Sequence, residues 1–440
     1  MTFIYFAVIE KIFEKYVVFY LNKYLKENDI ITKKQFGFQK GKGTESLLLD
    51  FTDKINTFLN NRLNVLAIFI DYSKAFDTLD HKILVKELGN IGVKGRLLNW
   101  FSSYLQNRSF IVKIADGESE VFQTNCGVPQ GSVLGPILYN IYVNSIVNEI
   151  KKADIFMYAD DTVLISACKN FEMAENILQE EYNKLLKWSH DRKLVINCKK
   201  TVVVHFHSSH SVVIRKPHIV SHSCVCLAQD NLVNCSCPVL SVKSEVRYLG
   251  LILDDLLKYD NHIQYILNKL KAIAAKLFHI KNSVPYHCLY IIYKSMVESY
   301  LRYGVESWGS AARHKLDRID RLQYKILLSL FNKNHYNQIQ NFSYNNIYLA
   351  FNTLPCKLWM IYKLIIFFRE NRLHRVERPK SVYSLRERSI YELPKFNNNY
   401  GKNMLDYSVP SLFNNLPASV YNCNKYSLIA MLLDIYSKPD

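Results

Sequence analysis

Ile155-Phe156-Met157-Tyr158-Ala159-Asp160-Asp161-Thr162-Val163-Leu164-Ile165 is the stretch that decides the fold. Apolar residues lie on both sides of a short acidic corner, a pattern that predicts two β-strands joined by a tight turn. A turn breaks the alternation of side chains along a strand, so the carboxylates of Asp160 and Asp161 are able to reach one site. Adjacent acids among apolar strands repel one another, and a divalent cation would remove that cost. The alternative is a surface turn, where aspartate is common.

Another acid, Asp71, follows a second apolar run. Residues 65–70 (VLAIFI) are long enough for a buried strand, and Asp71 comes directly after it. Ligands tend to bind at the carboxyl ends of strands in open sheets, and a buried acid is rarely structural unless it is paired. The order strand, helix, helix, hairpin, helix, strand predicts an α+β fold with a split βαβ sheet and helices on one face. Asp71, Asp160 and Asp161 would then converge, as needed to hold two Mg²⁺ ions.

The composition narrows the class of protein and of partner. The 440 residues carry 56 Lys plus Arg against 39 Asp plus Glu, a formal net charge of +17, which favours a nucleic acid or an anionic membrane surface as partner. With 49% hydrophobic and 22% charged residues, the chain is globular rather than disordered. No apolar run reaches the roughly 18 residues of a membrane span, so no transmembrane helix is predicted. Of the two polyanions, nucleic acid is the expected partner, and no membrane partner is expected. Ten cysteines without a compact framework favour a reducing compartment.

Two glycine-containing loops and one helix face are further candidates for ligand contacts. Residues 35–44 (QFGFQKGKGT) form a basic loop that could meet phosphates or simply be solvated. In residues 127–132 (GVPQGS), Gln130 lies between a proline and a glycine, where its amide could contact a substrate or merely fill a turn. The helix expected over residues 314–331 has a basic face, which favours the nucleic-acid backbone over a merely solvated face. That face holds Arg318, Arg321 and Lys325.

Histidine and cysteine are concentrated in and beside residues 207–245, which form an insert. They are His205, His207, His210, His218, His222, Cys224, Cys226, Cys235 and Cys237. Zinc uses such ligands, but the spacing is not a usual structural-zinc pattern. The Cys-x-Cys pairs on either side of residues 228–231 also fit a hairpin with small residues alternating on one face. The hairpin is therefore the preferred interpretation.

Five motifs in residues 7–255 resemble, in order, the reverse transcriptase domain of non-LTR retrotransposons, most like the jockey and chicken-repeat types. They are residues 69–77 (FIDYSKAFD), 127–135 (GVPQGSVLG), 158–161 (YADD), 194–201 (LVINCKKT) and 248–250 (YLG). The resemblance implies a right-hand polymerase with an α-helical thumb. Its expected parts are partial fingers over 1–64, a palm over 65–255 that includes the 207–245 insert, a helical thumb over 256–335, and a helical or irregular C-terminal region over 336–440.

The resemblance also implies a role for each matching residue. Asp71 and Asp160 would bridge two Mg²⁺ ions, for which Mn²⁺ is an alternative, and Asp161 would support them. The backbone at Lys74 and Ala75 would meet the dNTP triphosphate, and the Phe76 ring would exclude a ribose 2′-hydroxyl. The remaining matches are Gln130 beside the incoming nucleotide, Lys200 as a proton donor to the leaving pyrophosphate, and Tyr248, Leu249 and Gly250 as the primer grip.

The resemblance thus implies an RNA-directed DNA polymerase that uses an RNA template, a DNA primer or target DNA, and dNTPs. By family, it would act inside the cell, in the nucleus or in a cytoplasmic ribonucleoprotein. In the family a further fingers segment and an endonuclease region precede the part matched by residue 7 onward. A second hypothesis is therefore a truncated, catalytically inactive relic that still binds nucleic acid. A maturase or telomerase-like enzyme shares the palm, but no RNA-binding segment typical of either is recognisable.

Overall fold

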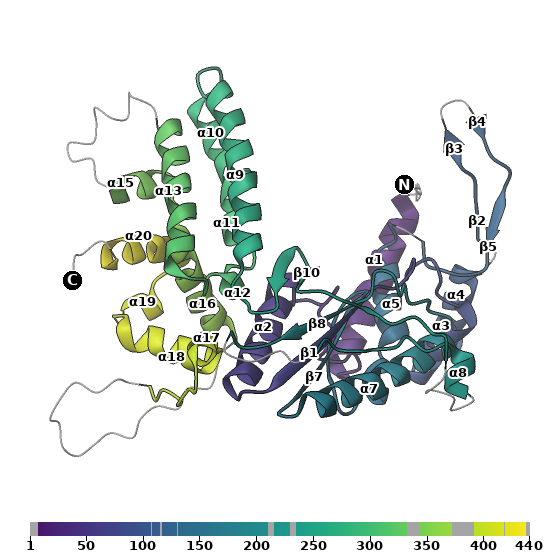
Figure 1. Ribbon diagram of the computed structural model, residues 1–440. Helices are drawn as coiled ribbons and strands as arrows, with labels where there is room; N and C mark the ends of the chain where they lie inside the picture. The colour runs from purple at the N-terminus through teal and green to yellow at the C-terminus, as the bar shows by residue number, and fades with distance from the viewer. Residues whose placement is uncertain are drawn as a thin grey trace, which may run out of the picture. The chain divides into compact units, whose positions relative to one another are not determined.

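The computed structural model describes residues 8–106, 108–114, 117–129, 131–209, 215–228, 235–331, 344–371, 391–417 and 419–436 (Figure 1). The chain forms two compact units. The first consists of Met1–Leu47 and Leu63–Ser244, and the second of Leu48–Arg62 and Glu245–Asp440. Among the helices that the structure describes, none has both the length and the apolarity needed to cross a membrane.

A five-stranded sheet forms the centre of the first unit. Its strands are β1 (Asn64–Ile70), β6 (Asp154–Tyr158), β7 (Asp161–Cys168), β8 (Val202–Phe206) and β9 (Ser241–Val242), in the order β6-β7-β1-β8-β9. β1 runs antiparallel to both β7 and β8, and only the β8–β9 pair is parallel. This is the split βαβ order with β9 added at the edge, so the α+β class and the sheet predicted from the element order are confirmed.

Helix α7 (Phe171–Asp191) packs on the sheet because apolar residues recur on one of its sides. The other helices of this unit are α1 (Val8–Glu27), α3 (His81–Asn90), α4 (Gly95–Leu105), α5 (Gly135–Val143), α6 (Ile146–Glu149) and α8 (Cys224–Ala228). In α7, Ala174, Leu178, Tyr182 and Leu185 are buried at helical spacing, and the helix packs on β1 and β7. Asn170 caps α7 by accepting hydrogen bonds from two backbone amides of its first turn.

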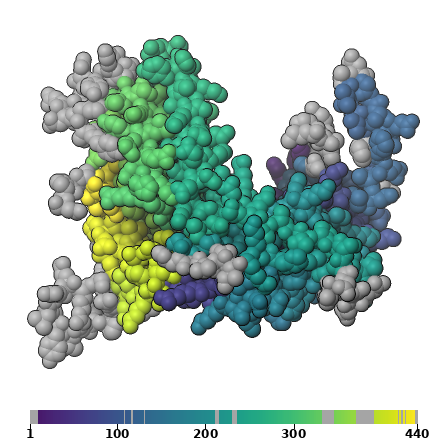
Figure 2. Space-filling view, viewed as in Figure 1, coloured from purple at the N-terminus to yellow at the C-terminus, as the bar shows by residue number. Residues whose placement is uncertain are grey.

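A narrow ribbon extends from the first unit (blue in Figures 1 and 2). β2 (Arg108–Phe110) pairs with β5 (Phe122–Thr124), and β3 (Lys113–Ile114) pairs with β4 (Gly117–Glu118). Apolar side chains on the ribbon stay open to solvent: Ile114 is 75% exposed and Val121 is 66% exposed. The ribbon therefore adds nothing to the core that surrounds the sheet.

The second unit is almost entirely helical. A hairpin of β10 (Glu245–Tyr248) and β11 (Leu251–Asp254) leads into α9 (Asp260–Ile280), which packs along α13 (Arg313–Leu330). Helix α2 (Thr44–Asn60) begins in the first unit and continues in the second. The other elements are α10 (Tyr286–Ile292), a π-helical turn η1 (Tyr293–Glu298), α11 (Ser299–Arg302), α12 (Val305–Trp308), α15 (Tyr344–Ala350), α16 (Cys356–Asn371), α17 (Asn399–Asn403), α18 (Leu405–Asn415), α19 (Ser419–Asn422) and α20 (Lys425–Ile435).

The two faces of α13 separate by polarity as the sequence predicts. Leu316, Ile319 and Ile326 are buried, whereas the three basic residues of the predicted face, Arg318, Arg321 and Lys325, are exposed. The finer division of the chain into partial fingers, palm, thumb and C-terminal region stays a prediction.

Candidate active site

The sheet brings together the three acids that the sequence singles out. Ile70, the last residue of β1, lies opposite Thr162 on β7, and Asp71 follows directly at that end of the sheet. Tyr158 pairs with Asp161 across the β6–β7 hairpin, which leaves Ala159 and Asp160 as its two-residue turn. Asp71 therefore lies beside the acidic turn.

Burial and mutual repulsion both act on these carboxyl groups. Burial, and to a smaller extent the charge of Asp71, raises the pKa of Asp160. Burial and then the charges of Asp160 and Asp71 raise the pKa of Asp161 to about 6, although part of that side chain meets solvent. Among the residues that the structure describes, the three acids do not form a group with all ligand atoms within 4.8 Å of one another. Like charges without a cation between them are expected to stay apart in this way.

The turn itself is held by a buried glutamine from far away in the sequence. Ala159 has φ +53°, a left-handed conformation that costs a non-glycine residue roughly 1–2 kcal/mol. The amides of Ala159 and Gly37 both donate to Oε1 of Gln35, at 3.0 and 2.8 Å. A Cβ on Gly37 would lie 2.4 Å from the nitrogen of Ala159, so only glycine permits this approach. These contacts offset the strain and fix the direction of Asp160.

The first residue of the basic loop over residues 35–44, Gln35, supports the acidic turn. Gln35 is 1% exposed and forms a parallel bridge with Met157, so its side chain supports the turn rather than facing a ligand. Lys42 Nζ donates to the backbone carbonyls of Lys33 and Gln35, at 2.8 and 3.0 Å. The phosphate contact of the loop stays a prediction, and the Lys42 ammonium already contacts two carbonyl groups.

Asp71 is held by the segment that contains Lys200. The amide of Asn197 donates to the carbonyl of Asp71 at 2.8 Å, and the amide of Asp71 donates to Thr201 Oγ1 at 3.2 Å. Lys200 Nζ lies 3.9 Å from Asp71 Oδ2, with 70% of its side chain exposed. The structure thus brings Lys200 to the carboxylate cluster on a side chain that remains free to move toward a ligand.

The aromatic ring of Phe76 is fixed from two sides. It stacks on Tyr139 of α5 with centroids 4.5 Å apart, and Phe38 meets it edge-on at 6.2 Å. Phe76 is half-buried, so part of the ring borders solvent next to the acids. The charges of Asp160 and Asp161 contribute, after burial, to raising the pKa of Tyr139, which places that phenol close to the carboxylates as well.

The turn before Phe76 is shaped by its contact with the glycine loop. Lys74 is exposed and has φ +51°, whereas Ala75 is buried. The amide of Val128 donates to the carbonyl of Phe76 at 3.0 Å. A Cβ on Gly127, whose φ is +79°, would lie 2.7 Å from the carbonyl oxygen of Asp77. The two motifs are therefore in direct backbone contact.

Four predicted residues remain. Gln130 lies outside the described residues. Tyr248, Leu249 and Gly250 belong to the second unit, where Leu249 and Gly250 have positive φ angles and form the turn between β10 and β11. The hydroxyl of Tyr303 donates to the carbonyl of Leu249. These residues thus lie at a hairpin turn, and their role as a primer grip stays a prediction.

Sequence reasoning missed three residues that position the site: Gln35, Gly37 and Tyr139. The side-chain amide of Asn140, next to Tyr139, donates to the backbone carbonyl of Gly37 at 2.8 Å, so α5 and the residue 35–38 segment are linked. The only sequence signal for Gly37 was its place between two phenylalanines in a loop. No sequence signal marks Tyr139, because it lies among the mostly apolar residues of α5 and is buried like its neighbours.

Comparison with known proteins agrees with this geometry. The family model described as "Reverse transcriptase (RNA-dependent DNA polymerase)" matches residues 4–253. The chain is 28% identical over 337 residues to the RNA-directed DNA polymerase from mobile element jockey of Drosophila melanogaster, covering 72% of this chain and 34% of that protein. It is 25% identical over 332 residues to the probable RNA-directed DNA polymerase from transposon BS of the same fly, covering 73% and 35%.

Solved telomerase structures are also similar, including that of Candida tropicalis telomerase in complex with a fragment of telomeric RNA. Its TM-score is 0.41 at 15% identity, over 81% of this chain and 50% of that one. The chain spans about a third of the length of the curated relatives it matches. Those relatives support the non-LTR retrotransposon type that the motifs indicate. Because the family model covers more than half of the sequence, the chain belongs to the reverse transcriptase (RNA-dependent DNA polymerase) family.

Proposed function

We propose that this chain is an RNA-directed DNA polymerase of a non-LTR retrotransposon, which adds deoxynucleotides from dNTPs to a primer 3′-hydroxyl along an RNA template. The observation that carries the proposal is the meeting of Asp71 with the Asp160–Asp161 turn at one end of the sheet. Transfer of a phosphoryl group depends on positioning and charge neutralisation more than on covalent chemistry. Acids held on a rigid sheet meet that need.

Reverse transcriptases generally use divalent metal ions, and the acids of this chain fit such an ion. The raised pKa values of Asp160 and Asp161 show that their negative charges are costly without a cation. We assign two Mg²⁺ ions to Asp71 and Asp160 with support from Asp161, and Mn²⁺ as a substitute. The ions would lower the pKa of the primer 3′-hydroxyl and neutralise the triphosphate.

The neighbouring residues supply the contacts to the nucleotide. The backbone of the turn at Lys74 and Ala75 would meet the triphosphate, and Gln130 would line the base. Phe76 would exclude a ribose 2′-hydroxyl, because Tyr139 stacks behind its ring and prevents it from moving aside. Lys200, whose ammonium lies 3.9 Å from Asp71, would donate the proton that the leaving pyrophosphate takes up.

The template and primer would be bound largely through charge. The net charge of +17 favours a polyanion, and the basic face of α13 is exposed as that role requires. Lys269, Lys271 and Lys276 of α9 are exposed as well. An RNA template with a DNA primer or target DNA would be held by its backbone without sequence preference, with Tyr248, Leu249 and Gly250 at the primer end. The site of action proposed from the family is the nucleus or a cytoplasmic ribonucleoprotein.

Primer extension on poly(A)/oligo(dT) with Mg²⁺ tests the proposal. The wild-type chain should incorporate dTTP, and Asp160→Ala should abolish incorporation. Asp154→Asn is the matched control, because Asp154 is the first residue of β6, at the end of the strand away from the acidic turn. If the wild-type chain binds template–primer but extends it no faster than Asp160→Ala, the inactive-relic hypothesis replaces this one.

A further inference from the structure

The second cluster of metal-binding side chains lies in the insert between β8 and β9. Two limbs of the insert run antiparallel, with Val220 bridged to Val239. The amide of Ser221 donates to the carbonyl of Pro238, and that of Leu240 to the carbonyl of Ile219, both at 2.8 Å. The pairing brings His222, at the end of one limb, next to the cysteines that begin the other.

The hairpin of alternating small residues is wrong for the first cysteine pair. Cys224–Ala228 forms the short helix α8, so Cys224 and Cys226 do not lie along an extended strand. The cysteines therefore lie on a helical turn and on an extended limb, and not on the two strands of a hairpin. Both segments lie next to His222, so possible metal ligands are close together.

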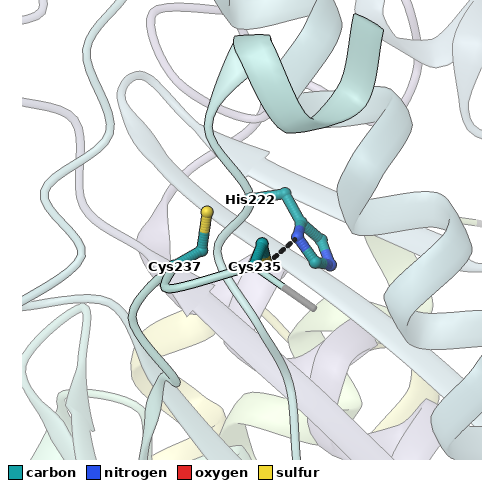
Figure 3. Close-up of side chains that lie close together, drawn as sticks. All are labelled: His222, Cys235 and Cys237. Atoms are coloured by element: carbon teal, nitrogen blue, oxygen red, sulfur yellow. Dashed lines mark hydrogen bonds between the residues drawn. The ribbon is translucent and has the colours of Figure 1, made fainter. Parts of the chain in front are cut away.

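Three ligand atoms of this cluster lie within 4.8 Å of one another: one ring nitrogen of His222 and the Sγ atoms of Cys235 and Cys237. His222 Nδ1 is 3.2 Å from Cys235 Sγ, and Figure 3 shows this contact as the dashed line between the imidazole ring and Cys235. His222 is buried, at 6% exposure. Among the described residues, no other group of three His, Cys, Asp or Glu side chains is as compact.

Cys226 is the candidate for a fourth ligand, although its Sγ is not one of the three ligand atoms that lie within 4.8 Å of one another. Its Sγ lies 3.5 Å from that of Cys237, at the side of the trio that α8 faces. In a tetrahedral zinc site with Zn–S near 2.3 Å and Zn–N near 2.0 Å, neighbouring ligand atoms are about 3.5–3.8 Å apart. The separations of 3.2 and 3.5 Å are close to those edges. Two of the six separations between ligand atoms in such a site are therefore already near the required length.

Hydrogen-bond donors already point at the sulfur atoms. The amide of Ser223 donates to Cys237 Sγ at 3.2 Å, and its hydroxyl donates to Cys226 Sγ at 3.3 Å. Donors of this kind stabilise the thiolate form, which is the form that binds metal.

We propose that His222, Cys226, Cys235 and Cys237 form a structural Zn²⁺ site. Three thiolates and an imidazole are soft ligands that select zinc over Mg²⁺, so this site is chemically distinct from the acids on the sheet. Four protein ligands leave no open position, as in structural rather than catalytic zinc sites. Binding would release the thiol protons to the solvent without any change in oxidation state.

The position of the site explains what the ion would stabilise. Next to His222, Ser221 Oγ lies 3.1 Å from the hydroxyl of Tyr182 on α7 and 3.2 Å from Cys198 Sγ. Cys198 belongs to the segment that holds Asp71 and Lys200. The zinc would therefore secure the insert against α7 and against the segment behind the carboxylates.

Metal analysis of the full-length chain tests the proposal. Protein purified under reducing conditions without chelator should contain one zinc per chain. After zinc removal, Co²⁺ should bind tetrahedrally with a thiolate-to-cobalt charge-transfer band. Cys235→Ser and Cys237→Ser should weaken binding by more than about 100-fold, because even the outer partners of a metal site contribute 10- to 100-fold. Cys224→Ser is the matched control and should retain the metal and the band.

The zinc content of an Asp160 variant and a cobalt titration of the wild-type chain test whether the cysteine cluster is the metal site. Asp160→Asn should keep its zinc, since the acids are a separate site. Cobalt titration of the wild-type chain does not depend on the folding of any variant. Octahedral binding without a thiolate-to-cobalt charge-transfer band would overturn the proposal, because oxygen ligands such as the acids on the sheet suffice for octahedral binding. Equal metal loss in Cys224→Ser and Cys235→Ser would also overturn the proposal. So would a disulfide between Cys226 and Cys237 that persists in protein purified under reducing conditions.

Discussion

Replacing Gln35 with alanine tests whether the acidic turn depends on a side chain from 124 residues earlier in the chain. Oε1 of Gln35 accepts hydrogen bonds from the amides of Ala159 and Gly37, at 3.0 and 2.8 Å, in a place that is 1% exposed. Each buried amide that loses its partner costs about 1–3 kcal/mol, so Gln35→Ala should lower the free energy of unfolding by about 2–6 kcal/mol. The unrelieved left-handed strain at Ala159 acts in the same direction.

Activity should fall as well, because the turn carries Asp160. Displacement of a catalytic group by about 1 Å can reduce a rate by roughly 100-fold. The assays are urea denaturation, hydrogen exchange at the amides of Ala159 and Gly37, and primer extension. Both amides should exchange faster in Gln35→Ala, and the rate of extension should drop by one to two orders of magnitude.

Gln39→Ala is the matched control for this experiment. Gln39 lies in the same segment and is half-buried, and its amide group donates to the backbone carbonyl of Gln35 at 2.8 Å rather than to the turn. It should lose no more than about 1 kcal/mol of stability. If Gln35→Ala unfolds at the same urea concentration as Gln39→Ala and extends primers at the wild-type rate, Gln35 does not hold the turn.

Three other predictions concern the same site. Phe76→Val should accept ribonucleotides more readily, lowering the dNTP-to-rNTP ratio of kcat/KM at least tenfold; an unchanged ratio would exclude Phe76 as the gate. Lys200→Ala should reduce kcat while Lys199→Ala, an equally exposed neighbour, should not; equal effects would point to general charge instead. The raised pKa of Asp161, about 6, means that the metal-free folded chain holds this proton more tightly than the unfolded chain. Its stability should therefore fall as pH rises from about 4 to 6, while Mn²⁺ affinity rises over the same range. Calorimetry at several pH values would show no such fall in stability if the carboxyl group titrated normally.

The features that follow from local pattern were predictable. The apolar run before Asp71 and the two runs around the acidic turn each have the length and apolar composition of buried strands. The order of elements then required Asp71 to end the strand beside the hairpin, as the Ile70–Thr162 pair shows. The polar and apolar faces of α13 were visible in the same way, from helical spacing alone.

The features that depend on distant contacts were not predictable. Nothing around Gln35 indicates that its amide will reach Ala159, because that contact depends on the bridge between Gln35 and Met157. His222 and Cys235 meet only because Val220 pairs with Val239, and because Gln179 of α7 bonds to the backbone of Val220 in both directions. Spacing rules for zinc ligands do not capture a site assembled by tertiary contacts of this kind.

The central claim is that acids from two separate segments bind the same divalent cations. Mn²⁺ binding measured by electron paramagnetic resonance on the full-length chain tests it most directly. The account predicts that Asp71→Asn and Asp160→Asn each weaken Mn²⁺ binding severely, and that the double variant is little worse than either one alone. Mn²⁺ affinity that is unchanged in Asp71→Asn would contradict the account, because the acid on β1 would then take no part in the site.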